Sequence, residues 1–184
     1  MDNGSVKSQE IIKMKISVLI SIYNKTTFPE FIKSFKSIIN QTKKSDEIII
    51  IFDGMIKFDI RFYLSNFKNV KIIQNSANMG LGISLSRGLI KCSGDIIIRQ
   101  DSDTFNSKKR FFYLWKNISI YKYDIIGSYM TENSKNNFRS TRKVPLEQDQ
   151  IYRKLNLKNK NPKIDDTRVR IIKYDKLYNE IFKL

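Results

Sequence analysis

The sequence predicts an α/β fold with helices on both faces of a mainly parallel central sheet. Three observations support this expectation: apolar runs rich in isoleucine, amphipathic segments between these runs, and polar residues directly after several of them. Continuous apolar runs are typical of strands buried on both faces. Their alternation with helices implies right-handed crossovers between parallel strands. An α/β/α sandwich is therefore the expected architecture.

The first elements are expected soon after a polar stretch at 1–13, which predicts a flexible tail. The apolar run 15–22 predicts a buried strand, and helical spacing of apolar residues over 28–40 predicts an amphipathic helix. Residues 47–52 are mostly β-branched and predict a second strand. Asp53-Gly54, a favoured turn pair, ends that strand.

The alternation continues through the middle of the chain. A short strand is expected at 70–74, and a helix at 81–92, where leucines recur at helical spacing. Cys92 falls on this helix and is expected to be a buried structural thiol. The run 95–99 predicts a fourth strand, which the acidic turn 101–103 follows directly.

The pattern weakens toward the carboxyl terminus. A helix is expected over 108–120 and a fifth strand over 124–130. The residues expected to pack this helix are Phe111, Phe112, Trp115 and Ile118. Beyond Thr131 the chain becomes rich in Asn, Ser and Lys, with a helix expected at 147–157 and one more strand and helix within 168–184.

The composition limits the possible chemistry. The chain has 184 residues, of which 41% are hydrophobic, and this suits one globular domain. It contains no histidine and one cysteine, which excludes His-dependent nucleophiles, His-ligated zinc and a disulfide framework. Without an apolar run of about 18 residues or a signal-peptide core at its start, the protein is expected in the cytoplasm.

The net charge of +16 favours polyanionic partners such as nucleic acid, an anionic membrane surface or phosphorylated substrates. A second explanation stays open, because a Lys-, Ile- and Asn-rich composition raises the charge without any specific partner. No recognised DNA- or RNA-binding motif is present, so no specific nucleic acid is expected.

Polar clusters follow three of the predicted strands, at 21–24, 53–54 and 101–103. In parallel sheets, ligands bind beyond the carboxyl ends of the strands. Asp101 and Asp103 predict a site for Mn²⁺ or Mg²⁺, which prefer oxygen ligands and often share them with phosphates, although a plain surface turn would look the same. Asp53 is a candidate hydrogen-bond acceptor for a nucleotide base or ribose, or else simply a turn residue.

Two further features are candidates for phosphate binding. Asn78 and Gly80 lie in a glycine-containing loop before a predicted helix, where backbone N–H groups can approach phosphate, unless the loop is only a turn and helix cap. Arg99 directly precedes the acidic turn, and arginine pairs well with phosphate. For Arg87 and Arg110, as for any single arginine, a solvated position or a structural ion pair is the default interpretation.

Taken together, these segments resemble the family 2 glycosyltransferases of the GT-A fold, a Rossmann-like α/β/α sandwich. The matching segments follow the family's order and are 17–24, 47–54, 78–82 and 99–103, with further matches at 109–111, 124–128 and 142–146. The resemblance covers about residues 15–167 and is greatest to transferases of bacterial capsule and exopolysaccharide synthesis. It implies a nucleotide-sugar-binding core at 14–130 and a partial acceptor-side region at 131–184.

The resemblance also implies roles for individual residues. Ser21 and Tyr23 would line the nucleotide site, and Asp53 would contact the base. Asp101 would face the ribose or the metal, and Asp103 would be the main metal ligand. The implied reaction is metal-dependent transfer from a nucleoside-diphosphate sugar to a saccharide or lipid-linked acceptor, with inversion, in surface polysaccharide synthesis.

The chain also departs from the family pattern. Phe52 stands where many members have an acidic residue, and Asp165 stands at the position of a histidine in the closest subgroup. The family's catalytic base belongs to a later Glu-Asp element that we do not find before Leu184, so the chain is expected to be short at this end. Asp165 and Asp166 are weak substitutes for the base.

Three function classes therefore remain open. The chain is an active transferase, peripheral on the inner face of the membrane; or a nucleotide-sugar-binding remnant or regulatory module; or, last in rank, a basic nucleic-acid-binding protein.

Overall fold

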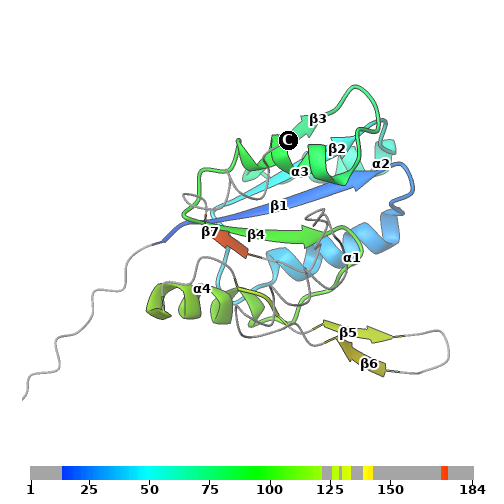
Figure 1. The fold of residues 1–184 in the computed structure, drawn as a ribbon. Helices are drawn as coiled ribbons and strands as arrows, with labels where there is room; N and C mark the ends of the chain where they lie inside the picture. The colour runs from blue at the N-terminus through cyan, green and yellow to red at the C-terminus, as the bar shows by residue number, and fades with distance from the viewer. Residues whose placement is uncertain (1–13, 122–125, 129, 134–138, 143–170, 174–184) are drawn as a thin grey trace, which may run out of the picture.

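The computed structural model describes residues 14–121, 126–128, 130–133, 139–142 and 171–173, and it has the expected sandwich architecture (Figure 1). The helices and strands are β1 (Ile16–Tyr23), α1 (Phe28–Ile39), β2 (Glu47–Asp53), α2 (Phe58–Leu64), β3 (Val70–Gln74), α3 (Leu81–Leu89), β4 (Ile96–Asp101), α4 (Arg110–Tyr121), β5 (Met130–Asn133), β6 (Arg139–Arg142) and β7 (Ile171–Lys173). The main sheet has the order β3-β2-β1-β4-β7. Its first four strands are parallel, and β7 pairs antiparallel with β4.

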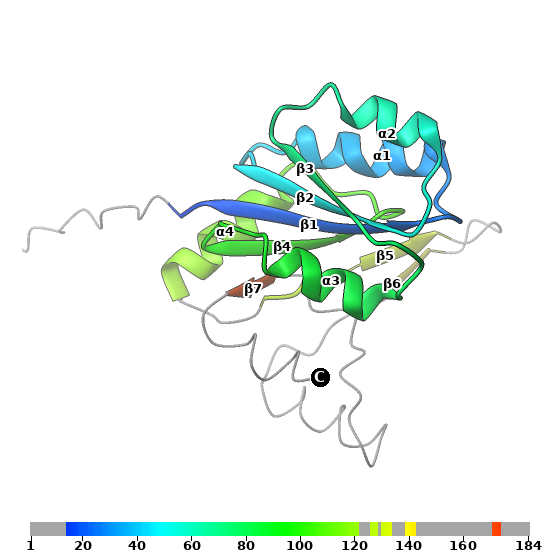
Figure 2. The same ribbon diagram turned by 90° about the horizontal axis from the view of Figure 1, so that it is seen from above.

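The helices cover both faces of this sheet (Figure 2). Alternate residues of each strand point to opposite faces. Ile16, Val18, Ile20 and Ile22 of β1 pack in one core cluster with residues of α1, α2 and α4. Leu19 of β1 packs in a second cluster with Ile49, Ile51 and Ile97 and with Leu89 of α3. A slip of one residue in register would move the side chains of each sheet face to the other face. The alternating isoleucines therefore specify the register of strand pairing.

Helix α3 approaches the sheet very closely at Gly88. A Cβ added to Gly88 would lie 2.4 Å from Leu19 Cδ1 and 2.6 Å from Ile51 Cδ1. Only a glycine therefore fits at this contact without a shift of the neighbouring side chains.

At the amino-terminal ends of the parallel strands, the buried carboxylate of Glu47 connects several elements of the sheet. This carboxylate accepts hydrogen bonds from Ser17 Oγ (2.7 Å), Ser93 N (2.5 Å), Ser93 Oγ (2.8 Å) and Lys71 Nζ (2.8 Å). Burial alone would raise the pKa of Glu47, but the hydrogen bonds from Lys71, Ser17 and Ser93 outweigh it and lower the pKa to about 2. One side chain thus links β1, β2, β3 and the turn before β4.

The predicted boundary of the helix at 81–92 was wrong at its carboxyl end. Helix α3 ends at Leu89, because Lys91 N and Cys92 N donate to the carbonyls of Gly88 and Leu89, three residues back, and tighten the last turn. Cys92 therefore lies beyond the helix. It is buried, as predicted, and burial together with the nearby Glu47 raises its pKa to about 12.

Other boundaries also differ from prediction. The fourth strand continues through Asp101, so the first acidic residue belongs to β4 rather than to the following turn. In α4, Phe112 was expected in the core but is 38% exposed, and Leu114 is buried in its place. The seven-residue α2 was not predicted, because so short a segment buries only Ile60 and Leu64.

The predicted fifth strand over 124–130 was also wrong. Residues 126–128 have no regular structure, and Met130 instead begins β5, which pairs antiparallel with β6 in a separate two-stranded sheet. β7 lies within the segment 168–184, where a strand was expected. The helix predicted at 147–157, the one predicted to follow β7, and Asp165 and Asp166 lie outside the described residues. Within the described part of the chain, no helix is long and apolar enough to cross a bilayer.

Candidate functional site

The carboxyl ends of three neighbouring strands bring the candidate residues to one edge of the sheet. β1 lies between β2 and β4, and its residues Tyr23 and Ser21 pair with Asp53 and Asp101, respectively. These four residues share their sheet face with Leu19, Ile51 and Ile97, which belong to the cluster under α3. The site therefore lies at the strand ends on the α3 side.

Asp53 is buried at the end of β2 and anchors the loop that precedes α3. Its carboxylate accepts hydrogen bonds from Asn75 Nδ2 (2.9 Å), Met79 N (2.8 Å) and Gly80 N (3.0 Å). Burial raises the pKa of Asp53, but the hydrogen bonds, those of Asn75 and Met79 foremost, outweigh it, and the pKa lies below its usual value. Asp53 is therefore a charged side chain that already accepts hydrogen bonds from the loop before α3.

The loop held by Asp53 differs from the expected phosphate cradle. The amides of Met79 and Gly80 point at Asp53, and Gly80 N also approaches Asn78 Oδ1 at 3.2 Å. Gly80 adopts φ +88°, a conformation that favours glycine. These two amides consequently stabilise the loop rather than face an outside phosphate.

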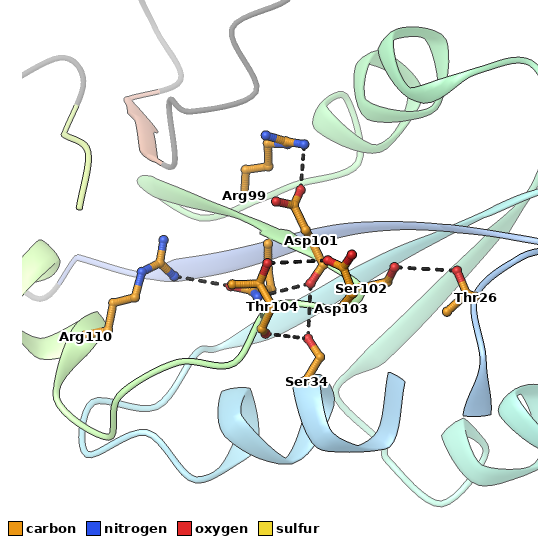
Figure 3. A network of polar contacts seen from close by, with 9 residues as sticks. Thr26, Ser34, Arg99, Asp101, Ser102, Asp103, Thr104 and Arg110 are labelled. Carbon is orange, nitrogen blue, oxygen red and sulfur yellow. Dashed lines mark hydrogen bonds and ion pairs between the residues drawn. The ribbon is translucent and has the colours of Figure 1, made fainter. Parts of the chain in front are cut away.

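Arg99 and Asp101 form an ion pair on the α3 side of β4. Arg99 is buried, and its Nη2 lies 2.6 Å from Asp101 Oδ1 (Figure 3). The guanidinium that was expected to bind phosphate is thus held against the first carboxylate of the acidic turn. Arg99 orients Asp101 and adds positive charge beside it.

The acidic turn itself is fixed from the opposite side of the sheet. Ser34 Oγ of α1 donates to the carbonyls of Asp101 (3.1 Å) and Thr104 (2.9 Å), as Figure 3 shows. Gln100 Nε2 donates to the same two carbonyls. Asp103 is exposed at the tip of this turn, so its carboxylate is open to an incoming cation.

Sequence reasoning missed the polar side chains that build this support. Ser34 and Ser37 are buried on α1, and Gln41 is buried just beyond its carboxyl end, at spacings of three and four residues. Ser37 Oγ accepts from Asn106 N (3.0 Å), and Gln41 Nε2 donates to Ser107 O (2.7 Å). The available signal was a polar stripe running along the apolar face of a helix.

Arg87 and Arg110 both hold neighbouring segments through hydrogen bonds to neutral side chains. Arg87 Nη1 donates to Asn75 Oδ1 (2.9 Å), which supports the Asp53 loop from behind. Arg110 donates to Gln100, Asn106 and Ser128. Neither guanidinium is directed toward the acidic turn by these contacts.

The donor set at the turn fits a hard divalent cation that also binds a ligand. Asp101 and Asp103 supply two carboxylates, and the described residues contain no group of three or more His, Cys, Asp or Glu that could hold a metal ion. Mg²⁺ is commonly bound by one or two carboxylates together with substrate phosphates. The turn therefore suits a cation shared with a diphosphate better than one held by protein alone.

Comparisons with known proteins show what the chain is similar to. Residues 17–176 match the family model described as Glycosyl transferase family 2. An uncharacterized glycosyltransferase of Haemophilus influenzae is 33% identical over 147 residues, covering 76% of this chain and 55% of that protein. A UDP-Gal:alpha-D-GlcNAc-diphosphoundecaprenol beta-1,3-galactosyltransferase of Escherichia coli is 39% identical over 101 residues, covering 53% of this chain and 36% of that protein. The chain thus spans about half, or less, of the length of these relatives.

The fold is similar to that of a solved structure. The crystal structure of S. aureus TarS 1-349 in complex with UDP superposes with a TM-score of 0.66 over 90% of this chain and 48% of that one, at 18% identity. At this level of identity the likeness establishes the GT-A fold of the chain.

Proposed function

Because the chain belongs to glycosyltransferase family 2, we propose that it binds a nucleoside-diphosphate sugar and transfers the sugar to a saccharide or lipid-linked acceptor. One observation carries this proposal: Asp53, Ser21, Tyr23 and Asp101 end three adjacent parallel strands on the same face of the sheet. Ligands of parallel α/β sheets bind at this edge.

We assign the nucleotide to the surface between β2 and β1. Ser21 and Tyr23 would line it, with Tyr23, which is 43% exposed, available to pack against the base. Asp53 would face the base or ribose from the end of β2 while it holds the loop. Asn78 and Gly80 would form the rim, within that loop.

We assign the diphosphate to the region in front of the acidic turn. Asp103 would be the main ligand of a Mn²⁺ or Mg²⁺ ion, and Asp101, oriented by Arg99, would be the second. Such an ion neutralises the charge that develops on a leaving nucleoside diphosphate. Arg99 would add positive charge on the same side.

The proposed reaction is a single displacement with inversion. The acceptor hydroxyl oxygen forms a bond to the anomeric carbon while the bond from that carbon to the diphosphate oxygen breaks, and a carboxylate takes the hydroxyl proton. Asp165 and Asp166 are the candidates for this base in the present chain. The Escherichia coli relative is named for a lipid-linked acceptor, and an acceptor of this kind would place the reaction at the inner face of the membrane.

Calorimetric titration of the full chain with UDP, with and without Mn²⁺, tests the donor site. We expect binding that Mn²⁺ strengthens, and loss of the Mn²⁺ effect in Asp103→Ala. Glu30→Gln is the matched control, since it removes the charge of another exposed carboxylate. In the described part of the chain, this carboxylate accepts a hydrogen bond from Thr27 Oγ1. A folded protein that binds no UDP under either condition would refute the donor site.

A second candidate is nucleotide-sugar binding without transfer, because the candidate residues at the strand ends all lie on the donor side of the proposed reaction. Release of UDP from UDP-sugars distinguishes the two functions. Turnover that disappears in Asp103→Ala supports the transferase, whereas tight UDP binding without turnover supports the binding module.

A further inference from the structure

The solvent side of α4 carries an unusual combination of lysine and apolar residues. Residues at helical spacing along this side, which we call the α4 stripe, are Lys109, Phe112, Tyr113, Lys116 and Ile120. The three apolar members are well exposed: Phe112 by 38%, Tyr113 by 54% and Ile120 by 51%. The opposite side of the helix faces the core through Phe111, Leu114 and Ile118. The stripe is thus a second apolar surface on a helix whose core-facing surface is already buried.

The segment after α1 extends this surface with more positive charge. Thr42 N donates to Lys108 O at 2.9 Å, which places the two segments side by side. Lys43 Nζ lies 4.6 Å from the centroid of the Trp115 ring. A lysine above an aromatic ring keeps its charge at the surface while its stem covers apolar atoms.

Both segments lack acidic residues. Residues 40–45, which follow α1, contain two lysines, and residues 104–121 contain three lysines and one arginine; neither range contains Asp or Glu. In the described part of the chain, the ion pairs Lys71–Glu47 and Arg99–Asp101 both lie elsewhere. Among the residues that the structure describes, the lysines of this surface form no ion pair with a carboxylate.

We propose that the α4 stripe, with Lys43 and Lys108 beside it, is a docking surface for an anionic lipid bilayer. Helices that lie on membranes combine lysines with exposed aromatic and aliphatic residues, because the lysines meet lipid phosphates while the apolar side chains enter the headgroup region. Nucleic acid would use the lysines but would leave Ile120 without a role. The α1 and α4 layer lies on the face of the sheet opposite α3 (Figures 1 and 2), so the docked surface would leave the α3 side uncovered.

Docking of this kind would bring the donor site close to a lipid-linked acceptor. This consequence rests on the proposed function, whereas the membrane binding itself does not. The test is flotation of the full chain with vesicles of phosphatidylcholine alone and with vesicles of equal parts phosphatidylcholine and phosphatidylglycerol. We expect binding only to the mixed vesicles, weakened by added salt. UDP titration of the same samples reports the donor site separately, so the two proposals fail independently.

Three pairs of substitutions distinguish this surface from the general charge of the protein. Each lysine near an anionic surface contributes enough affinity that K109Q/K116Q should weaken vesicle binding by about thirtyfold. The control K68Q/K91Q removes the same charge from exposed lysines outside the surface and should change binding less than about threefold. Tyr113→Ser with Ile120→Ser keeps the charge and should still weaken binding severalfold, because apolar insertion is lost.

Several results would overturn the proposal. Absence of binding to the mixed vesicles would do so, as would equal losses in the two lysine pairs. Full binding by the variant with serine at 113 and 120 would show that charge alone is responsible. Binding of random duplex DNA that exceeds vesicle binding, and that K109Q/K116Q abolishes, would assign the surface to nucleic acid instead.

Discussion

Replacement of Glu47 by glutamine is expected to remove most of the acid sensitivity of folding that this side chain causes. In the folded chain the pKa of Glu47 is about 2, against an ordinary value of 4.5. A difference of about 2.5 in pKa corresponds to about 3 kcal/mol of folding free energy. Because the folded pKa is the lower one, this stability is present above pH 4.5 and is lost as the pH falls toward 2.

Glutamine keeps the shape of the side chain but cannot hold the charge. Its oxygen can still accept from Ser17 and Ser93, whereas its amide would face the Lys71 ammonium, 2.8 Å from the present carboxylate. We expect Glu47→Gln to be less stable than wild type by about 3 kcal/mol at pH 7 and nearly as stable at pH 2. Lys71 itself is 63% exposed, so Lys71→Met should cost less than about 1 kcal/mol.

The assay is urea denaturation followed by circular dichroism at intervals from pH 7 to pH 2. The stability difference between wild type and Glu47→Gln should shrink through the window between pH 4.5 and pH 2. Glu30→Gln, which alters an exposed carboxylate, is the control and should follow the wild-type curve. Parallel curves for wild type and Glu47→Gln across this window would refute the assignment of the pH effect to Glu47.

Three further predictions concern packing, the acidic turn and the buried thiol. Gly88→Ala should lower stability by about 1–3 kcal/mol in thermal denaturation, because the added Cβ meets Leu19 and Ile51. Gly82→Ala is the control and should be neutral or stabilising, since nothing lies within 4 Å of its added Cβ. Equal effects of the two substitutions would disprove the close approach of α3. Ser34→Ala should lower the free energy of unfolding by about 1 kcal/mol and weaken Mn²⁺-dependent UDP binding in calorimetry. Ser65→Ala removes an exposed hydroxyl that donates to Phe62 O and should leave UDP binding unchanged. Normal UDP binding by the Ser34 variant would show that the acidic turn does not need the Ser34 hydrogen bonds. Cys92, with its pKa near 12, should react with a thiol reagent only after denaturation, and rapid reaction in the native state would contradict its burial.

The strands that form the centre of the sheet were predictable because they carry a strong local signal. Isoleucine-rich runs such as that of β2 are buried in full, and the predicted bounds of β3 were correct. The predicted convergence of strand ends followed from the parallel order alone. β5 and β6 were not predicted, because they form a separate two-stranded sheet of four-residue strands that carry no apolar alternation.

Candidate residues could be found from the sequence, but their contacts could not. Asp53 and Arg99 were identified as polar residues at or near strand ends, yet each is engaged with a neighbour, Asp53 with the amides of Met79 and Gly80 and Arg99 with Asp101. Such contacts depend on loop conformation, which the residue types alone do not determine. The roles of these residues toward a nucleotide sugar remain predictions for the binding experiments above.

Because β1 lies between β2 and β4, the sheet fixes the distance between the backbone positions of Asp53 and Asp101 at the strand ends. Asp53 and Asp101 pair with residues two apart on β1, so they are offset by two strand spacings, roughly 10 Å, across the sheet and by about 7 Å along it. Hydrogen-bond ladders, not flexible side chains, set both lengths. Point substitutions in the loops can therefore change which chemical groups are recognised, but a ligand of different span would require a change of strand order or register.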